Sequence, residues 1–512
     1  MNKKYQPIVI SLLIIIGIVI GSNTTQKNKN HEKDKINSIL QLINSHYVDS
    51  IGKDFEENII NSILKDLDPH TTYIPQKDYQ AVKENMLGDF SGIGIEFNII
   101  EDTIVVVSPI NGGPSEKLGV LSGDRIIEVD SINIAGIGIE NSGVVKRLRG
   151  VKGTTVNIKV KRRNIKQIIE FKIIRNTIPL NSVDVSMMIT KTTGFLKLNR
   201  FSAKTSSEFT KETTKLLEAG MKELILDLRD NPGGYLSAAI NICDHFIIDG
   251  DPIVYTKGRN RKETKIAASS SRLLEDIKLV VLINEGSASA SEIISGAVQD
   301  NDRGTIIGRR SFGKGLVQEE IKLKDGSAIR LTTQRYYTPS GRSIQKSYGG
   351  NINEYYLEQY LRNDSILPDS LKFKTKKGRI VFGGGGINPD IIIEKDTFLD
   401  YKTINKIIAN GWIREFSMKY TDLNRKNIKK ITNRKEYINK IEDIIYNQFL
   451  AYINKKDSSF NQNIKDEDMR FIKKQVMANI SRNLWGNEDY YRIMIDDDKY
   501  VKKGLEIMKT LN

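Results

Sequence analysis

Apolar residues recur at helical spacing close to both ends of the chain. On the N-terminal side, the runs 36–43 and 55–64 place isoleucines and leucines three or four positions apart. On the C-terminal side, two longer stripes share this period; they are Ile438, Ile441, Ile444, Ile445, Phe449 and Leu450, and Met469, Ile472, Val476, Ile480 and Leu484. This period predicts amphipathic helices. We therefore expect a small N-terminal helical unit and a C-terminal helical accessory domain.

Between Gly88 and Ile174 the pattern changes to short apolar blocks separated by glycines, which is typical of strands and turns. The expected strands cover 91–97, 103–107, 123–129 and 155–160, with short helices at 115–118 and 142–148. This segment is predicted to be a β-rich domain.

The middle of the chain alternates buried strands with helices. The expected strands are 194–198, 224–229, 279–284 and 391–393, and the expected helices are 206–219 and 236–246. This alternation implies a parallel sheet covered by helices, so the fold class is α/β. The loops Asp230–Gly234 and Asn284–Glu292 each follow a strand and precede a helix. Because sites in open α/β sheets gather at the carboxyl ends of strands, we expect these loops to face each other.

Length and charge exclude some classes of protein. A chain of 512 residues is too long for one ordinary domain, and 39% hydrophobic residues argue for folded cores. The net charge is +15, but bases are mixed with acids and no basic run carries interleaved aromatics, so no nucleic acid is expected as a partner. The single cysteine, Cys243, excludes an intrachain disulfide and a cysteine zinc cluster.

Lys3 and Lys4 precede an apolar run at residues 8–20, which is the pattern of an export signal. No Ala-x-Ala site follows, and no cysteine is placed there for lipid attachment. We predict an uncleaved membrane anchor, with a cleaved signal peptide as the alternative. The protein is then exported, either anchored in the inner membrane and facing the periplasm, or periplasmic.

Candidate chemistry lies in a run of small residues that contains Ser287, Ser289 and Ser291, and in Lys314, which stands between two glycines. A serine hydroxyl attacks a carbonyl only when a base removes its proton and donors stabilise the oxyanion. A buried lysine can be that base, because burial lowers its pKa from about 10.4 toward neutral. The interpretation is a serine protease with a lysine base.

The four histidines do not fit the role of the base. His31 and His46 lie in the N-terminal helical part, His70 beside a proline is interpreted as a turn residue, and His245 in an apolar helix as a packed core residue. A structural alternative exists for the serine, since Ser289 and Glu292 fit a helix capping box. Both roles are compatible, and spacing does not choose among the three serines.

Six motifs carry a family resemblance; they are 226–234 (LDLRDNPGG), 286–292 (GSASASE), 299–300 (QD), 312–318 (FGKGLVQ), 335–339 (RYYTP) and 386–390 (GINPD). In order and spacing they resemble the C-terminal processing peptidases, the tail-specific proteases of peptidase family S41. The resemblance runs from about residue 35 to 395. It implies a crotonase/ClpP-like protease core with an inserted PDZ domain.

The resemblance also implies roles for single residues. Ser289 aligns with the nucleophile, Lys314 with the general base, and Gln318 with the residue that orients the lysine. The implied oxyanion donors are the backbone N–H groups of Ala290 and of either Gly233 or Gly234. No cofactor and no metal are needed for this chemistry.

The β-rich segment resembles a PDZ domain in the permuted arrangement of bacterial proteases. The loop that would bind the carboxylate of a peptide C-terminus is Gly92-Ile93-Gly94-Ile95, and the peptide would add as a strand. The expected partners are proteins or peptides with free C-termini, and the membrane through the N-terminal segment. A homo-oligomer or an adaptor protein is left open. In relatives this domain gates the active site, which implies a resting state with Ser289 and Lys314 apart.

The predicted function is a serine endopeptidase that binds C-terminal tails of exported proteins and processes or degrades them. Its expected domains are 1–22 (signal or anchor), 23–87 (tether and helical unit), 88–176 (PDZ), 177–395 (protease core) and 396–512 (helical accessory domain). One alternative is a non-catalytic PDZ scaffold with a decayed protease core, and another is a crotonase-like acyl-transfer enzyme. The presence of Ser289, Lys314 and Gln318 argues against decay. The PDZ segment and the lack of an evident nucleotide or CoA pocket argue against acyl transfer.

Overall fold

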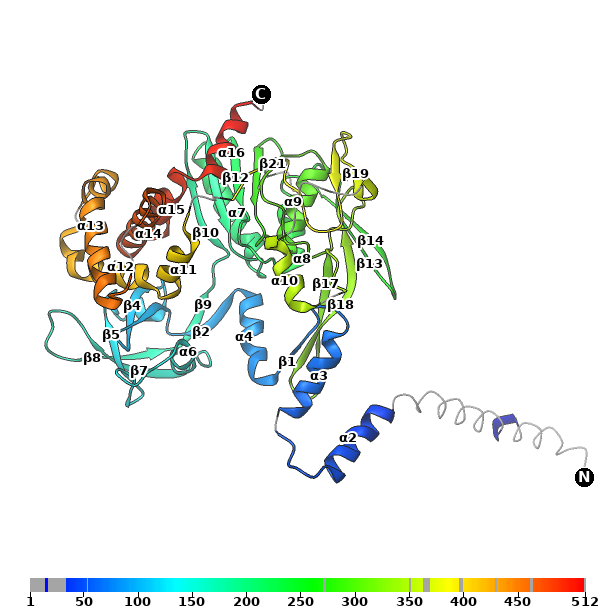
Figure 1. The fold of residues 1–512 in the computed structure, drawn as a ribbon, viewed down its shortest axis with the longest axis horizontal. Coiled ribbons are helices and arrows are strands. Elements are labelled where there is room, and N and C mark those ends of the chain that lie inside the picture. Colours follow the sequence, from blue (N-terminus) through cyan, green and yellow to red (C-terminus); the bar gives the residue numbers. More distant parts are fainter. Residues whose placement is uncertain are drawn as a thin grey trace, which may run out of the picture. The chain divides into compact units, whose positions relative to one another are not determined.

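The structure is a computed structural model. It describes residues 14–16, 34–52, 54–269, 273–349, 351–361, 369–395, 399–428, 431–460 and 464–510. The chain divides into two compact units, 1–67 and 68–512, and each is described by itself. The described residues mix helices and strands, which confirms the predicted α/β class (Figure 1).

In the first unit, α2 (Asp34–His46) and α3 (Phe55–Lys65) lie at the two predicted apolar stripes. In α3, Glu56 lies in the first turn and Lys65 in the last. These charges stabilise the helix because they complement its dipole.

The predicted anchor at residues 1–22 lies outside the described residues, apart from Ile14, Ile15 and Ile16. Within the ranges that the structure describes, no helix has both the length and the apolar character needed to cross a membrane. The anchor and its cleavage therefore stay predictions.

Residues 89–179 form the β-rich domain, and the paired strands β2 (Asp89–Gly92) and β9 (Asn176–Pro179) bring its two ends together. Its sheet has the order β3-β4-β5-β7-β8, with β6 beside β5. The elements are β3 (Ile95–Ile100), β4 (Thr103–Pro109), α5 (Pro114–Lys117), β5 (Arg125–Val129), β6 (Ile132–Asn133), α6 (Asn141–Leu148), β7 (Thr155–Lys161) and β8 (Ile169–Ile174).

Alternating burial explains this sheet. In β7, Val156, Ile158 and Val160 are buried, whereas their neighbours along the strand are exposed or only partly buried. They pack in one core with Ile104 and Ile126 from the neighbouring strands. Strand β3 stands at the end of the sheet path and pairs with β4. The sheet therefore has an edge at β3.

The central sheet has the order β10-β11-β12-β15-β16-β21. Strand β10 pairs antiparallel with β11, and the other neighbours are parallel, as the alternation of strands and helices predicts. The strands are β10 (Val183–Met188), β11 (Thr193–Leu198), β12 (Glu223–Asp227), β15 (Lys278–Ile283), β16 (Thr305–Gly308) and β21 (Ile391–Ile392).

Helices cover both faces of the central sheet (Figure 1). On one face, α7 (Thr205–Glu218), α8 (Leu236–Cys243) and α9 (Ala290–Asp300) pack in one core with Leu226 of β12. On the other face, α16 (Lys499–Thr510) packs against Ile225, which precedes Leu226 in the same strand. The last helix, predicted to belong to an accessory domain, thus forms a layer of the core.

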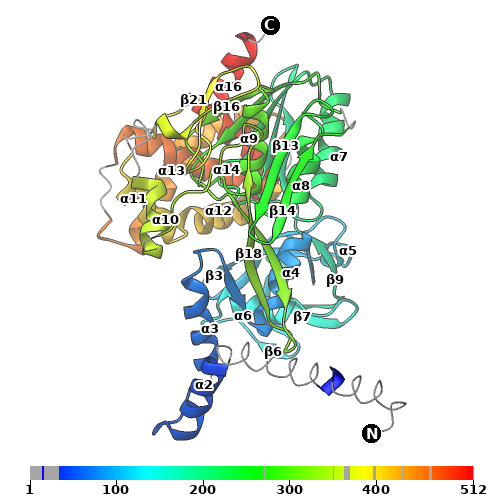
Figure 2. The same ribbon diagram turned by 90° about the vertical axis from the view of Figure 1, so that its right-hand side faces the viewer.

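A further sheet has the path β1-β18-β13-β14, with β17 on β18, and Figure 2 shows β13, β14 and β18 together. Strand β1 (Thr72–Ile74), which precedes the β-rich domain, pairs with the start of β18. The other strands are β13 (Pro252–Gly258), β14 (Arg261–Ala267), β17 (Leu316–Lys322) and β18 (Ala328–Tyr337). The other elements of the second unit before the C-terminal helices are α4 (Gln76–Leu87), α10 (Ile352–Leu361), η2 (Asp369–Leu371) and the paired strands β19 (Lys372–Lys374) and β20 (Ile380–Phe382).

The C-terminal helices are α11 (Tyr401–Ala409), α12 (Trp412–Ile428), α13 (Arg434–Lys456), α14 (Asp466–Trp485) and α15 (Asn487–Asp496). Both predicted stripes contribute to their shared core, but Ile444 is 59% exposed, so the prediction that it belongs to the stripe is wrong. Helix α12 also reaches the β-rich domain, where Met418 packs against Val105 and Val107. The helical C-terminal part is therefore in contact with both the central sheet and the β-rich domain.

Candidate active site

The two glycine- and serine-rich loops face each other at the carboxyl ends of β12 and β15, as predicted. Asp230 N–H donates to Asn284 Oδ1 at 2.9 Å, and Asn284 Nδ2 donates to Asp230 Oδ1 at 2.8 Å. The N–H of Ala288 donates to the carbonyl of Asn231 at 3.0 Å. These bonds hold the loops together at the edge of the sheet where sites in α/β folds gather.

The extent of burial distinguishes Ser289 from the other two serines. Ser287 and Ser291 are both 0% exposed, and Ser289 is partly exposed. The Ser287 hydroxyl donates to the Leu228 carbonyl at 2.8 Å, and the Ser291 hydroxyl donates to the Asn231 carbonyl at 2.9 Å. Both outer serines therefore serve the loop structure, and the middle serine is the one that a substrate can reach.

Ser289 has a strained backbone at the start of α9. Its φ is +54°, in the left-handed region that residues other than glycine rarely adopt. It follows a buried strand and precedes a helix, as in the strained turns that expose nucleophiles. Ala290 is the first residue of α9, so its N–H is one of the helix's unpaired donors. The hydroxyl of Ser289 and this N–H thus lie at the positive end of the helix dipole.

The carboxylate of Glu292 connects the serine loop with the lysine loop. Its Oε2 accepts from the N–H of Ser289 at 2.8 Å and from the N–H of Lys314 at 2.9 Å. Its Oε1 accepts from the Gly313 N–H at 2.7 Å and from the Ser311 hydroxyl at 2.5 Å. Burial raises the pKa of this carboxyl, although these bonds oppose the shift. The bond from Ser289 N–H is one half of the predicted capping box.

Lys314 is partly buried, and its Nζ donates to Gln318 Oε1 at 2.8 Å. Burial, and then the charge of Arg330, lowers the pKa of Lys314 to about 8, while the charges of Glu292 and Asp68 oppose the shift. Among the described residues, Nζ makes this bond and none to the Ser289 hydroxyl. The structure therefore brings Lys314 and Gln318 together and leaves the Lys314 amine and the Ser289 hydroxyl unbonded.

Glycines around the lysine allow the close packing that buries it. Gly313 has a φ of +94°, and a Cβ there would meet the backbone of Gly385 at 3.0 Å. A Cβ on Gly315 would meet the N atom of Gln345 at 3.0 Å. A side chain at either position would push the lysine loop away from its neighbours.

Tyr336 joins the same two loops and was not predicted from the sequence as a site residue. Its hydroxyl lies 3.1 Å from the carbonyl of Ser289 and also bonds to the carbonyl of Lys314. Its ring is 1% exposed, and burial raises the pKa of its hydroxyl. Local sequence offers no signal for this contact, because the partners come from separate loops.

The two glycines after Asn231 differ in their surroundings. A Cβ on Gly233 would lie 2.8 Å from Ser289 Cβ and 2.9 Å from Ala290 N, so Gly233 directly faces Ser289. Its own N–H, however, donates to Asn231 Oδ1 at 2.9 Å. Gly234 lies opposite Phe201 in an isolated β-bridge. In this bridge the Phe201 N–H donates to the Gly233 carbonyl and the Tyr235 N–H donates to the Phe201 carbonyl, so the N–H of Gly234 is not used.

His70 lies in a turn, as the sequence indicated, and this turn reaches the site. Gln318 Nε2 donates to the His70 carbonyl at 2.5 Å, and His70 Nε2 lies 2.8 Å from the Tyr355 hydroxyl. His245 was predicted to be a packed core residue in an apolar helix, but α8 ends at Cys243 and His245 is only partly buried. It stacks on Phe209 and lies 2.9 Å from the Thr210 hydroxyl. His70 is thus the histidine that contacts the predicted catalytic group.

The glycine loop of the β-rich domain joins β2 to β3. Gly92 ends β2, Gly94 has a φ of +75°, and Ile95 begins the edge strand β3. Ile93 is 2% exposed and belongs to the domain core, and its carbonyl accepts from Ser115. The loop therefore leads into β3, the end strand of the sheet, and its carboxylate-binding role stays a prediction.

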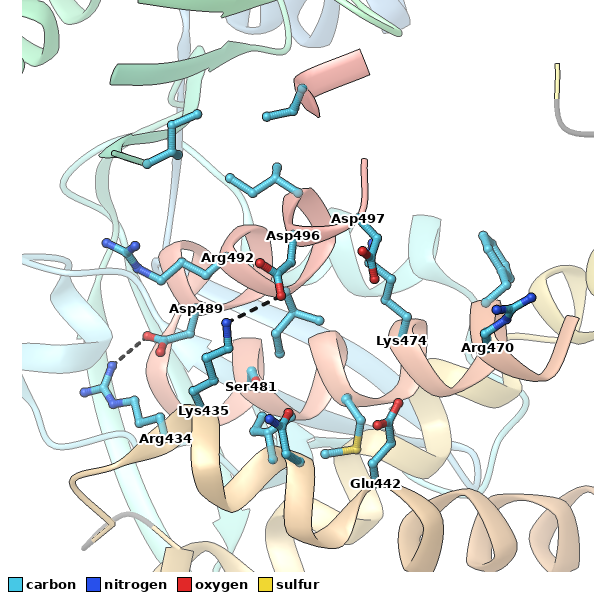
Figure 3. Close-up of a pocket in the computed structure, with 18 of the residues that line it drawn as sticks. Arg434, Lys435, Glu442, Arg470, Lys474, Ser481, Asp489, Arg492, Asp496 and Asp497 are labelled. Atoms are coloured by element: carbon cyan, nitrogen blue, oxygen red, sulfur yellow. Dashed lines mark hydrogen bonds and ion pairs between the residues drawn. The ribbon is translucent and has the colours of Figure 1, made fainter. Parts of the chain in front are cut away.

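A cavity of about 1210 Å³ lies among the C-terminal helices, away from these residues (Figure 3). Two ion pairs lie among the residues that line the cavity. Arg434 pairs with Asp489 at 2.7 Å, and Lys435 pairs with Asp496 at 3.5 Å. None of the predicted site residues lines it. The loops around Ser289, and not this cavity, hold the groups suited to catalysis.

Comparison with known proteins adds three family matches. Residues 192–353 match peptidase family S41, residues 91–173 match the PDZ domain, and residues 403–486 match a family of unknown function. The carboxy-terminal-processing protease of Bartonella bacilliformis is 38% identical over 340 residues, which cover 65% of this chain and 77% of the relative. The carboxyl-terminal-processing protease of Picosynechococcus sp. is 32% identical over 370 residues, which cover 68% and 88%. A solved structure, the photosystem II D1 C-terminal processing protease, is 25% identical over 69% of this chain and 86% of that chain, with a TM-score of 0.37.

Proposed function

The chain belongs to peptidase family S41 and is a serine peptidase of the C-terminal processing group, and on that premise we propose that Ser289 is its nucleophile, Lys314 its general base and Gln318 the residue that orients the base. The observation that carries this proposal is the shared anchoring of the two loops. One buried carboxylate, that of Glu292, accepts the backbone N–H groups of both Ser289 and Lys314. The backbones of the proposed nucleophile and the proposed base are therefore anchored to the same carboxylate.

In the proposed reaction, the neutral amine of Lys314 takes the proton of the Ser289 hydroxyl as Oγ attacks the peptide carbonyl. The resulting ammonium gives that proton to the leaving amine, and an acyl-enzyme forms. A water then loses its proton to the lysine and attacks the ester. The new C-terminus leaves as the ammonium returns this proton to Oγ of Ser289, which restores the hydroxyl and the neutral amine. A lysine with a pKa of about 8 is partly neutral at physiological pH, whereas an exposed lysine is almost fully charged.

The oxyanion needs two donors. We assign the first to the N–H of Ala290 at the start of α9. Gly233 faces Ser289, but its N–H is engaged with Asn231. The N–H of Gly234 takes no part in the bridge to Phe201, which favours Gly234 as the second donor.

We also propose that the PDZ domain selects substrates by their C-termini. A peptide would add along the edge strand β3, and its carboxylate would bind at the loop Gly92–Ile95. Engagement of a tail would move the domain and bring Lys314 to the Ser289 hydroxyl. The measurement is competition between peptides with free and amidated C-termini. Equal inhibition by both would contradict carboxylate recognition.

The proposed substrates are exported proteins, because Lys3, Lys4 and the apolar run at 8–20 form an export pattern. Residues 1–35 fused to a reporter enzyme that folds only outside the cytoplasm test this point. Reporter activity that depends on the apolar run supports export. An inactive reporter with the run intact overturns it.

The central test is cleavage of an unfolded reporter protein with an apolar tail. Ser289→Ala and Lys314→Ala should each abolish cleavage, whereas the exposed matched controls Ser207→Ala and Lys324→Ala should retain it. Mass spectrometry of the products identifies the cut. Undiminished cleavage by folded Ser289→Ala would refute the assignment of the nucleophile.

A further inference from the structure

The turn that precedes β1 reaches the predicted catalytic residues from a distant part of the chain. His70 is separated from Gln318 by the whole PDZ domain and most of the central sheet in sequence. Its carbonyl nevertheless accepts from Gln318 Nε2 at 2.5 Å, and Gln318 Oε1 accepts from Lys314 Nζ at 2.8 Å. A continuous chain of hydrogen bonds thus runs from the backbone of His70 to the amine of Lys314.

Asp68 fixes the shape of this turn. Its Oδ1 accepts from the N–H groups of His70 and Thr71, both at 2.8 Å, and its Oδ2 accepts from the Thr71 hydroxyl at 2.6 Å. Burial opposes ionisation of the carboxyl, but these hydrogen bonds outweigh burial and lower the pKa of Asp68. The turn continues into β1, which pairs with β18. The hydrogen bonds of Asp68 and the pairing of β1 with β18 therefore fix the position of the His70 carbonyl, and we call this turn and its contacts the frame of the carbonyl.

Aromatic side chains hold the ring of His70 on the other side. It meets Phe312 and Tyr355 edge-on, with ring centroids 6.2 and 5.4 Å apart. Its Nε2 lies 2.8 Å from the Tyr355 hydroxyl. Phe312 is two residues from Lys314, so the ring packs on the loop that carries the base.

The chemistry of an amide explains what this frame does. A glutamine amide has one end that only accepts and one end that only donates hydrogen bonds. A carbonyl carries no proton, so the His70 carbonyl requires the Nε2 end of Gln318. The Oε1 end must then face Lys314 and accept one of its N–H bonds. With an N–H committed there, the lone pair of the neutral amine points elsewhere and is free for the serine proton.

We propose that the Asp68–Thr71 turn is a positioning element for catalysis, which sets the amide orientation of Gln318 through the His70 carbonyl and so keeps the lone pair of Lys314 available. This inference rests on the proposed function of Lys314 as the general base. Without the turn, the amide can rotate and direct its NH₂ group at the amine. The amine lone pair would then accept that N–H, and proton transfer from Ser289 would slow.

The ring of His70 contributes no charge to the site at neutral pH. Burial, and then the charge of Lys314, lowers the pKa of His70 to about 4; Asp68 opposes the shift and Lys346 adds to it. The charged groups that act on Lys314 itself are Arg330, Glu292 and Asp68. A test of the turn must therefore leave these charges unchanged.

Thr71→Val meets this requirement, because it removes the hydroxyl that bonds to Asp68 and changes no charge. Its matched control is Thr72→Val, the exposed neighbour on β1. Thr71→Val should lower kcat by about tenfold with KM within about twofold, and thermal unfolding should show that it is folded. In a Gln318→Ala background, Thr71→Val should lower kcat by less than about twofold. The turn acts through Gln318, so its effect should be lost when the amide is already absent.

The pH profile gives a second readout that loss of a purely structural turn would not move. A rotated amide directs donors at the amine and disfavours the ammonium, so the midpoint of the acid limb of kcat/KM should fall by about half to one pH unit. Tyr355→Phe tests the same frame from α10, because it removes the hydroxyl bonded to the His70 ring and leaves the hydrogen bonds of Asp68 in place; the exposed Tyr360→Phe is its control. It should shift the midpoint in the same direction.

Two results would overturn the positioning role. One is a Thr71→Val enzyme with wild-type kcat and an unmoved pH midpoint, and the other is an equal fractional loss with and without Gln318. Ser289→Ala separates this failure from failure of the proposed function. If Ser289→Ala is inactive while Thr71→Val behaves as wild type, the protease assignment stands and the positioning role is rejected.

Discussion

Glu292 and Lys314 are joined by a hydrogen bond of 2.9 Å from the backbone N–H of Lys314 to Oε2 of the carboxylate. The same oxygen accepts the N–H of Ser289 at 2.8 Å, and Glu292 is 0% exposed. The backbone N–H groups of Ser289 and Lys314 thus share one anchor that water does not reach. The positions of Ser289 and Lys314 relative to each other therefore depend on this carboxylate as well as on the strands next to their loops.

Glu292→Gln should damage both stability and activity. An amide would turn an NH₂ group toward backbone N–H donors, and buried donors would be left without an acceptor. We expect a loss of about 2–4 kcal/mol in the free energy of unfolding and a fall of more than tenfold in kcat/KM. Urea denaturation and reporter cleavage measure the two effects. The exposed Glu218→Gln is the control, and an unaffected Glu292→Gln enzyme would contradict the anchor.

Activity should rise with pH. Burial, and then the charge of Arg330, lowers the pKa of Lys314 to about 8, and the base acts only in its neutral form. The kcat/KM profile should therefore increase through about pH 8 and level off above it. Arg330→Gln removes a cation that disfavours the ammonium, so it should move this midpoint upward. A profile that is flat between pH 7 and 9 would argue against a lysine base.

Lys314→Met should inactivate the enzyme and stabilise its fold. The folded pKa, about 8, lies below the unfolded value, so the folded chain binds fewer protons between these two values. The free energy of unfolding of the wild type therefore rises with pH across that window, and below it the lysine destabilises the fold. At pH 7 the substitution should add about 1–3 kcal/mol, and the gain should shrink toward pH 10.

Urea denaturation at both pH values checks this expectation, with the exposed Lys324→Met as the control. A Lys314→Met protein that is less stable than the wild type at pH 7 would show that packing around the amine outweighs its desolvation.

The last helix should matter for activity, because it contacts the loops of the site from the far face of the sheet. Arg229 bonds to Asp498 at 2.8 Å and lies over the ring of Tyr500, 4.6 Å from its centroid. Arg309 also bonds to Tyr500, and to Glu285 in the serine loop at 2.8 Å. Tyr500→Ala should cost about 3 kcal/mol in stability and reduce kcat/KM.

Chemical denaturation and cleavage assays measure this effect, with Tyr401→Ala on α11, 49% exposed, as the control. If Tyr500→Ala and Tyr401→Ala have the same stability and the same kcat/KM, the packing of α16 on the central sheet does not contribute to stability or activity.

Several features of this protein follow from the sequence alone. Burial alternates with a fixed period along a strand or a helix, so apolar spacing predicts elements such as β7 and α7 without knowledge of their partners. The positions of Asp230–Gly234 and Asn284–Glu292 after buried strands also sufficed to predict that these loops meet. Resemblance to a family then singled out Ser289 and Lys314. The domain boundaries stay predictions.

Only the tertiary structure distinguished Ser289 from Ser287 and Ser291 by burial, and only it brought His70 to Gln318. It also placed α16 on the central sheet, although the sequence indicated an accessory domain. The physical reason is the range of the interactions. Helix and strand periodicity is set by neighbours a few residues apart, whereas the partner of a buried hydroxyl or carbonyl is whichever distant segment the fold brings within 3 Å.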